Sequence, residues 1–214
     1  MPDIYYRRNL PHIHPEGHPL FITFRLANSL PVEVLAELNA MCERELENSR
    51  GKSPQDIYSI EKKYFDRYDK CLDQCLSGPR RLAEESIART ITEKIHAMDS
   101  EQFHVTAYCI MPNHVHLLIE SLIAEHLQHR GKAAKYPVTD ALRLLKGNTA
   151  RSCNLLLQQS GAFWHHESYD HFVRDEQDME RIIRYILNNS VKAGIVKEWK
   201  EWQFTYINPT LGSW

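Results

Sequence analysis

Two short extended segments joined by a turn, at residues 103–119, constrain the fold of this chain more than any other feature of its sequence. From Phe103 to Met111, the side chains Phe, Val, Ala, Cys and Met alternate with His, Thr, Tyr and Ile. This repeat of two residues is the period of a β-strand. Pro112-Asn113 is a turn signal, and His114 to Ile119 is again extended and apolar. The sequence therefore predicts a β-hairpin of two strands.

In most of the segments around this hairpin, apolar residues recur with the spacing of an α-helix. A strand rich in Phe and Ile is predicted at 19–27, after an irregular arm over the first eighteen residues. Apolar residues at helical spacing predict helices within 32–47, 58–72 and 82–98, and later at 139–157 and 176–191. A short strand is predicted at 171–174, a surface loop at 124–138 and an aromatic tail after 193.

This order of elements favours one architecture. We predict an α+β fold with a ferredoxin-like β-α-β-β-α-β core and an antiparallel sheet. The 214 residues suit one domain, 1–214, with its core at about 19–47 and 82–192. A helical insertion at about 48–81 follows the first strand, a tyrosine-bearing helix lies near the C-terminus, and the tail covers 193–214.

The composition excludes several classes of protein. Hydrophobic residues make up 43% of the chain, which is typical of a globular domain. The net charge of −2 argues against a protein that coats duplex DNA by bulk electrostatics. The sequence contains no apolar run of about 20 residues and no apolar stretch at the N-terminus. We therefore expect a soluble, cytoplasmic protein without a membrane partner.

His114-Val115-His116 is the first candidate for chemistry. Side chains two apart on a strand project from one face, so both imidazoles can converge on one metal ion. Chance proximity of two of the twelve histidines is an equally good explanation of the spacing alone.

Tyr185 and Asn189 are the second candidate. On the helix predicted at 176–191 they lie one turn apart, on a polar flank beside the apolar face. A phenol beside a carboxamide, near a bound ion, would pair a nucleophile with an electrophile-activating metal. The alternative is that Tyr185 is a partly exposed packing residue.

Met111-Pro-Asn-His-Val-His-Leu-Leu-Ile119, followed by Tyr185-Ile-Leu-Asn-Asn-Ser-Val-Lys-Ala-Gly-Ile-Val196, resembles the REP-associated tyrosine transposases of the HUH single-tyrosine group. Further matches are Phe21-Ile-Thr-Phe-Arg25, Leu145-Lys146 with Asn154, Phe163-Trp164 and Tyr169-Asp-His171. The resemblance covers about 5–28 and 80–206. The chain departs from the family in having Asn189-Ser190 where Asn-Pro is usual, and in the length of its insertion.

The resemblance implies a metal-dependent single-stranded DNA transposase and endonuclease acting at hairpin, REP-like sequences. His114, His116 and Asn189 would bind Mg²⁺ or Mn²⁺, and Tyr185 would form a 5′-phosphotyrosine. Histidine ligands suit manganese at least as well as magnesium. No Gly-x-x-x-x-Gly-Lys-Ser/Thr loop is present, so we expect no nucleotide cofactor.

Other polar residues have two readings each. Lys146 occupies a family lysine position and would contact a phosphate, or is a solvated helix lysine. The arginines that would line a basic groove for DNA are Arg7, Arg8, Arg143 and Arg151, together with Arg174 and Arg184. Asp170 and His171 would orient a ligand or water as supporting groups, or form a structural pair at a strand end.

Three functions remain open on the sequence. The first is the DNA-cutting and DNA-joining enzyme. The second is a domesticated DNA-hairpin binding protein without cleavage, and the third is a metal-dependent phosphoesterase in which water attacks. The oligomeric state is open between monomer and homodimer.

Overall fold

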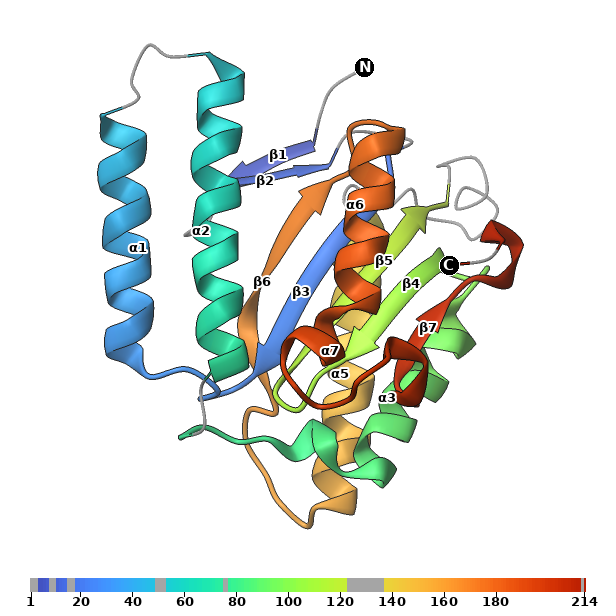
Figure 1. Ribbon diagram of the computed structural model, residues 1–214. Coiled ribbons are helices and arrows are strands. Elements are labelled where there is room, and N and C mark those ends of the chain that lie inside the picture. The colour runs from blue at the N-terminus through green and yellow to red at the C-terminus, as the bar shows by residue number, and fades with distance from the viewer. Residues whose placement is uncertain are drawn as a thin grey trace.

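The computed structural model describes residues 4–7, 11–14, 18–48, 53–74, 77–122, 137–212 and 214. Its centre is a five-stranded antiparallel sheet in the order β6-β3-β5-β4-β7 (Figure 1). The strands are β3 (Leu20–Leu26), β4 (Phe103–Ile110), β5 (His114–Ser121), β6 (Trp164–Phe172) and β7 (Thr205–Ile207), and a separate hairpin pairs β1 (Ile4–Arg7) with β2 (Pro11–His14).

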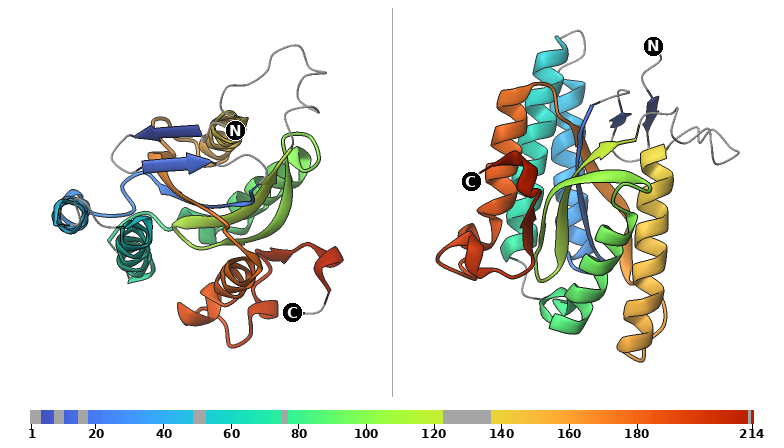
Figure 2. Two further views of the ribbon diagram at one scale, coloured as in Figure 1. Left: turned by 90° about the horizontal axis from the view of Figure 1, so that it is seen from above. Right: turned by 90° about the vertical axis from the view of Figure 1, so that its right-hand side faces the viewer.

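The helices form a layer on each side of the sheet (Figure 2). They are α1 (Val32–Glu47), α2 (Pro54–Gln74), α3 (Glu85–Met98), α5 (Pro137–Leu156), α6 (Glu176–Leu187) and α7 (Asn189–Lys192). The helices α3 and α5 cover one face, whereas α1, α2 and α6 lie on the other. The path β3-α3-β4-β5-α5-β6 and its strand order confirm the predicted α+β, ferredoxin-like fold.

Strand β3 explains how the sheet has a core on both faces. All seven of its residues are buried. Leu20, Ile22, Phe24 and Leu26 belong to the core beneath α3 and α5. The alternate residues face the other layer, and two of them, Thr23 and Arg25, are polar. The interior on the α2 and α6 side is therefore built to hold polar groups.

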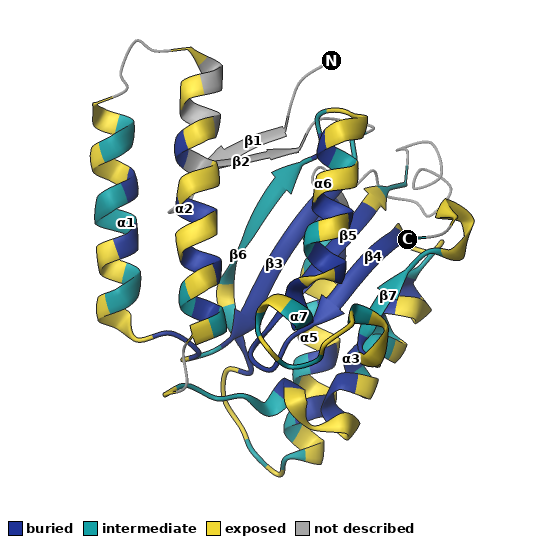
Figure 3. Cartoon of the chain, in the orientation of Figure 1, coloured by how far each residue is buried: buried dark blue, intermediate teal, exposed yellow. Residues whose placement is uncertain are grey.

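The inserted helices form a hairpin of their own. Helix α1 packs on α2 and shares with it a core that includes Leu38, Cys42 and Tyr64. Figure 3 shows exposed residues along much of α1, while α2 turns buried residues toward the sheet. The segment that separates β3 from α3 thus includes α1 as well as the stretch predicted at 48–81, and the crossover helix of the core is α3.

Several element boundaries differ from the sequence prediction. The N-terminal arm, expected to be irregular, contains the β1-β2 hairpin. The strand predicted at 171–174 is β6, which begins at Trp164 and pairs with β3 along its length. The first part of β6 was missed because β6 is an edge strand with mostly half-buried side chains, so its sequence mixes polar and apolar residues without a clear period. The tail contributes β7, which pairs with β4.

Among the described residues, none of the helices combines the length and the apolar character that crossing a bilayer requires.

Candidate metal and tyrosine site

His114 and His116 are held at the start of β5, on the face covered by α2 and α6. Both side chains are fully buried. Asn113 anchors the first imidazole: its amide nitrogen donates to the Leu72 carbonyl of α2 at 2.8 Å, so its oxygen faces Nδ1 of His114 at 2.7 Å. Because an amide oxygen only accepts, Nδ1 carries the proton and Nε2 presents a lone pair. Nδ1 of His116 lies 2.8 Å from the Thr23 hydroxyl on β3.

The two imidazoles point their Nε2 atoms at one another, 3.0 Å apart. Asn189 places its amide nitrogen 3.1 Å from Nε2 of His116, which is consistent with a lone pair there too. Two lone pairs facing at this distance repel unless a positive charge lies between them. Burial, and next the neighbouring His116, lower the pKa of His114 to about 3, so the neutral form that binds metals is the stable one.

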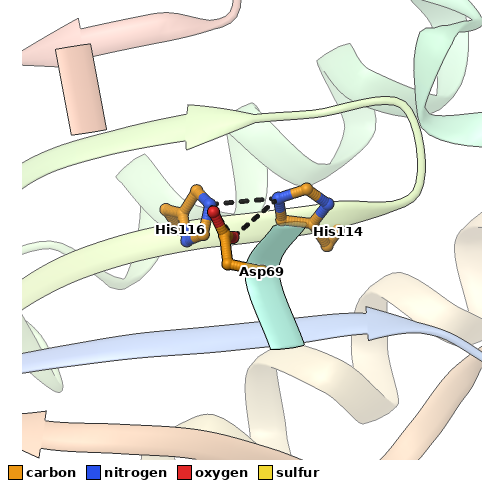
Figure 4. Close-up of side chains that lie close together, drawn as sticks. All are labelled: Asp69, His114 and His116. Carbon is orange, nitrogen blue, oxygen red and sulfur yellow. Dashed lines mark hydrogen bonds and ion pairs between the residues drawn. The ribbon is translucent and has the colours of Figure 1, made fainter. Parts of the chain in front are cut away.

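Asp69 of α2 adds a carboxylate to this pair (Figure 4). Its Oδ1 lies 3.2 Å from Nε2 of His116 and 3.7 Å from Nε2 of His114. Burial raises the pKa of Asp69, but its contacts with His116, His114 and the Tyr185 hydroxyl together outweigh burial and keep that pKa well below its usual range. The ligand atoms of Asp69, His114 and His116 lie within 4.8 Å of one another, so the group can hold a metal ion.

Unpaired buried oxygens also fit a cation. Oδ1 of Asp69 and Oδ1 of Asn189 are buried and have no hydrogen-bond partner among the described residues. Buried polar atoms normally have a partner, and these two lie beside the imidazole nitrogens. Two nitrogens and two oxygens of this kind form a mixed set that suits a divalent transition metal.

Helix α6 brings Tyr185 to the same place. Asp175 caps its first turn by accepting a hydrogen bond from the backbone of Asp178. The apolar face of α6, with Ile182 and Ile186, packs against the sheet. Tyr185 lies on the flank, as its position in the helix predicts, and its hydroxyl donates to Oδ2 of Asp69. Burial, followed by the charge of Asp69, raises the pKa of Tyr185 well above its ordinary value.

Asn189 reaches the site because α6 ends before it. Helix α6 stops at Leu187, and the short helix α7 begins at Asn189, which is fully buried. The continuous helix predicted at 176–191 is therefore interrupted. The amide of Asn189 lies against His116 at this break, while the hydroxyl of Tyr185 meets Asp69.

Three residues of the site, Asp69, Asp73 and Lys192, were not predicted from the sequence. The ammonium of Lys192 lies 3.2 Å from Oδ2 of Asp69 and 3.5 Å from Oδ2 of Asp73. Burial, and next the charge of Asp69, raise the pKa of Asp73 to about 6. A signal existed in α2, because Asp69 interrupts an apolar stripe one turn after Phe65, a position where a carboxylate needs a partner.

Three predicted DNA-contacting residues, Lys146, Arg143 and Arg151, lie on α5, away from this site. Lys146 of α5 donates to the carbonyls of His165 and His166 at 2.8 and 3.0 Å, on the opposite face of the sheet from Tyr185. Arg143 and Arg151 are exposed on the same helix. The side chain of Arg7 and the whole of Arg8 lie outside the described residues.

Asp170 and His171 do not act as a pair, because consecutive residues of β6 face opposite sides of the sheet. His171 lies 3.0 Å from the buried carboxylate of Asp178 at the start of α6. Asp170 instead lines a cavity of about 390 Å³ beside α5, together with Lys146. His171 therefore contacts the first turn of α6, the helix that carries Tyr185, whereas Asp170 lies on the other side of the sheet.

A ferredoxin-like sheet with paired histidines on a central strand and a tyrosine on the covering helix is the arrangement that the resemblance to single-tyrosine transposases implies. The model of the family described as "Transposase IS200 like" matches residues 80–189, just over half of the chain. The chain belongs to this family.

Two similar proteins show which kind of transposase this chain resembles. A protein of Haemophilus influenzae, provisionally named a REP-associated tyrosine transposase, is 28% identical over 104 residues, which cover 48% of this chain and 58% of the relative. The chain therefore matches a little over half of that relative's length. The solved structure of a REP-associated tyrosine transposase bound to a REP hairpin superposes with a TM-score of 0.53 at 17% identity, covering 94% of this chain and 80% of the other. These findings confirm the predicted resemblance to the REP-associated tyrosine transposases.

Proposed function

We propose that this protein cleaves and rejoins single-stranded DNA beside hairpins, using Tyr185 as nucleophile and a divalent metal held by His114 and His116. One observation carries the proposal: the Tyr185 hydroxyl and the two Nε2 atoms meet at the same buried carboxylate, Asp69. Family membership and the REP hairpin bound by the structural neighbour support the choice of substrate.

The metal would be held by Nε2 of both histidines, by Oδ1 of Asp69 and by the amide oxygen of Asn189. The side-chain amide of Asn189 would flip by about 180° to present its oxygen, since its nitrogen now faces His116 and its oxygen has no hydrogen-bond partner among the described residues. When bound, Mn²⁺ or Mg²⁺ supplies positive charge that neutralises and orients the scissile phosphate. The two nitrogen ligands favour Mn²⁺ over Mg²⁺.

Tyr185 would attack the phosphorus, forming a phosphotyrosine as the bond to the 3′-oxygen breaks. The phenol is protonated at neutral pH, because its pKa is raised. Oδ2 of Asp69 already accepts its hydrogen bond and would orient it toward the phosphate, while the phenolic proton passes to water and the departing 3′-oxygen takes a proton from water and becomes a hydroxyl. Attack of a 3′-hydroxyl on the phosphotyrosine reverses the step, so no external energy source is needed.

The DNA must reach a site that is closed in this structure. Both histidines, Asp69 and Asn189 are fully buried, and the cavity beside Tyr185 has a volume of only about 30 Å³. A strand can enter only if α2 or α6 shifts away from the sheet. We therefore propose that hairpin binding and opening of these helices are coupled.

The test is a covalent adduct. Single-stranded DNA hairpins with 3′ and 5′ extensions, labelled at the 3′ end, are incubated with the protein and Mn²⁺ and then denatured. We expect an adduct between the protein and the labelled fragment that survives denaturation and is absent in Tyr185→Phe, with cleavage reduced at least ~10³-fold. The matched control is Tyr206→Phe, a tyrosine of β7 that packs on Tyr108 away from the site.

The other two functions give different results in the same assay. Binding without cleavage in any metal would identify a hairpin-binding protein. Metal-dependent cleavage that persists in Tyr185→Phe would identify a phosphoesterase that uses water. Either outcome would contradict the role proposed for Tyr185.

A further inference from the structure

Arg25 is a buried cation beside the candidate site that the proposed chemistry does not use. It lies on β3 directly opposite His114 of β5, and residues paired in this way project from the same face of the sheet. Its side chain is among the largest in the protein that are fully buried, at 1% exposure. A full positive charge therefore lies one strand away from the proposed metal ligands.

The hydrogen bonds of Arg25 are incomplete. Nη1 donates to the Ser29 hydroxyl at 3.1 Å and to the Leu26 carbonyl at 3.4 Å. Nε and Nη2 are buried without a hydrogen-bond partner, and the guanidinium forms no ion pair within the described part of the chain. The Tyr68 hydroxyl adjoins the guanidinium, but not in hydrogen-bonding geometry to these two nitrogens. A buried charge left in this state is costly, so an anionic partner is expected.

The two unpartnered nitrogens of Arg25 are buried beside a cavity that the residue lines. Nε and Nη2 form the side of the fork that grips two oxygens of a phosphate at once. Arg25 lines a cavity of about 100 Å³ between β6 and the α1-α2 hairpin, together with Asn39, Tyr64 and Tyr68. From β6 the half-buried His165, Glu167 and Ser168 complete the wall, so the cavity borders the surface of the protein.

We propose that Arg25 binds a non-scissile phosphodiester group of the single-stranded DNA, close to the phosphate that Tyr185 attacks. This inference rests on the proposed function and deepens it. The register of β3 and β5 places Arg25 next to His114, so a strand on the metal would pass its adjoining phosphate over this cavity. Arg25 would thus fix the direction of the strand, because phosphate contacts position a nucleic acid without reading its sequence.

The experiment removes one phosphate charge at a time. A hairpin strand is selected from a randomised library on the metal-free protein, and each phosphodiester in turn is replaced by a neutral methylphosphonate. For the wild type, we expect one non-scissile position to weaken binding about 10- to 100-fold, the value of a charged hydrogen-bonded contact. In Arg25→Gln and Arg25→Lys, binding of the unmodified strand should fall by a similar factor, with no further loss at that position.

The control is Arg89→Gln, which removes an exposed arginine of α3 that pairs only with Glu85 among the described residues. It should keep the wild-type pattern. If the Arg25 variants remain sensitive at every position where the wild type is sensitive, the inference is wrong. Loss of cleavage with this binding pattern intact would overturn only the chemistry proposed for Tyr185.

A second measurement needs neither DNA nor a stable variant. Wild-type protein labelled with ¹⁵N-arginine is titrated with inorganic phosphate, and the Nε–H signals are followed. The Arg25 signal, assigned by its connectivity along the backbone, should shift and saturate, whereas that of exposed Arg143 should not. An Arg25 signal that does not respond to phosphate would contradict the proposal.

Discussion

The hydroxyl of Tyr185 donates a hydrogen bond to the carboxylate of Asp69, a residue 116 positions earlier in the chain. One oxygen of Asp69 faces this phenol and Lys192, and the other faces the two imidazoles. The carboxylate therefore links the tyrosine helix to the histidine strand. It comes from α2, which belongs to the segment inserted between β3 and α3, so the insertion contributes directly to the candidate site.

Asp69→Asn should weaken the binding of Mn²⁺ by at least about 10-fold, because it removes a charged ligand while keeping the shape of the side chain. Isothermal titration with Mn²⁺ measures the affinity, and His116→Ala gives the reference for loss of a ligand. Asp66→Asn, an exposed carboxylate one turn earlier, should bind Mn²⁺ like the wild type. Unchanged affinity in Asp69→Asn would exclude Asp69 from the metal site.

Lys146→Met should lower the free energy of unfolding by about 1 kcal/mol, since it removes hydrogen bonds to two backbone carbonyls of β6. Arg143→Gln, on the exposed side of the same helix, should change it by less than about 0.5 kcal/mol. Urea unfolding of both variants makes the comparison. A Lys146→Met variant as stable as the wild type would show that these bonds contribute nothing net.

Asp178→Asn should lower the free energy of unfolding by about 2 kcal/mol at pH 7, because it removes the negative charge of a buried carboxylate that contacts His171 and Arg181. Burial opposes ionisation of Asp178, but His171 and Arg181 outweigh it and keep the pKa below the ordinary 3.8. A depressed pKa stabilises the fold above that value, and the contribution is lost as the pH falls below it. The difference between variant and wild type, measured by urea unfolding, should therefore shrink between pH 4 and more acidic pH. A difference that stays constant would contradict this assignment.

Gly78→Ala should lower the free energy of unfolding by about 1–3 kcal/mol. A Cβ at this position would lie 2.8 Å from three backbone atoms of Asn28 and Ser29, which cannot move aside as a flexible side chain does. Gly147→Ala is the matched control, because a Cβ in that part of α5 meets nothing within 4 Å. It should raise the free energy by about 0.5–1 kcal/mol, as alanine favours a helix. Equal effects in thermal unfolding would refute the steric argument.

Much of the core could be predicted because its signals are local. The alternation at 103–111 predicted β4, the extended apolar run at 114–119 predicted β5, and the order of the elements predicted the ferredoxin-like core. Strand β6 was predicted too short, because an edge strand with half-buried residues has no clear apolar period. The break between α6 and α7 was missed because Asn188 and Asn189 fit a helical pattern equally well.

The sequence by itself determined which residues share a face. A period of two places His114 and His116 on one side of a strand, and a period of 3.6 places Tyr185 and Asn189 on one flank of a helix, because backbone geometry fixes both. Only the tertiary structure decided that Asp69 would join them and that Arg25 would be buried beside His114. Those contacts join segments about 45 to 115 residues apart, and no local period records which distant segments pack together.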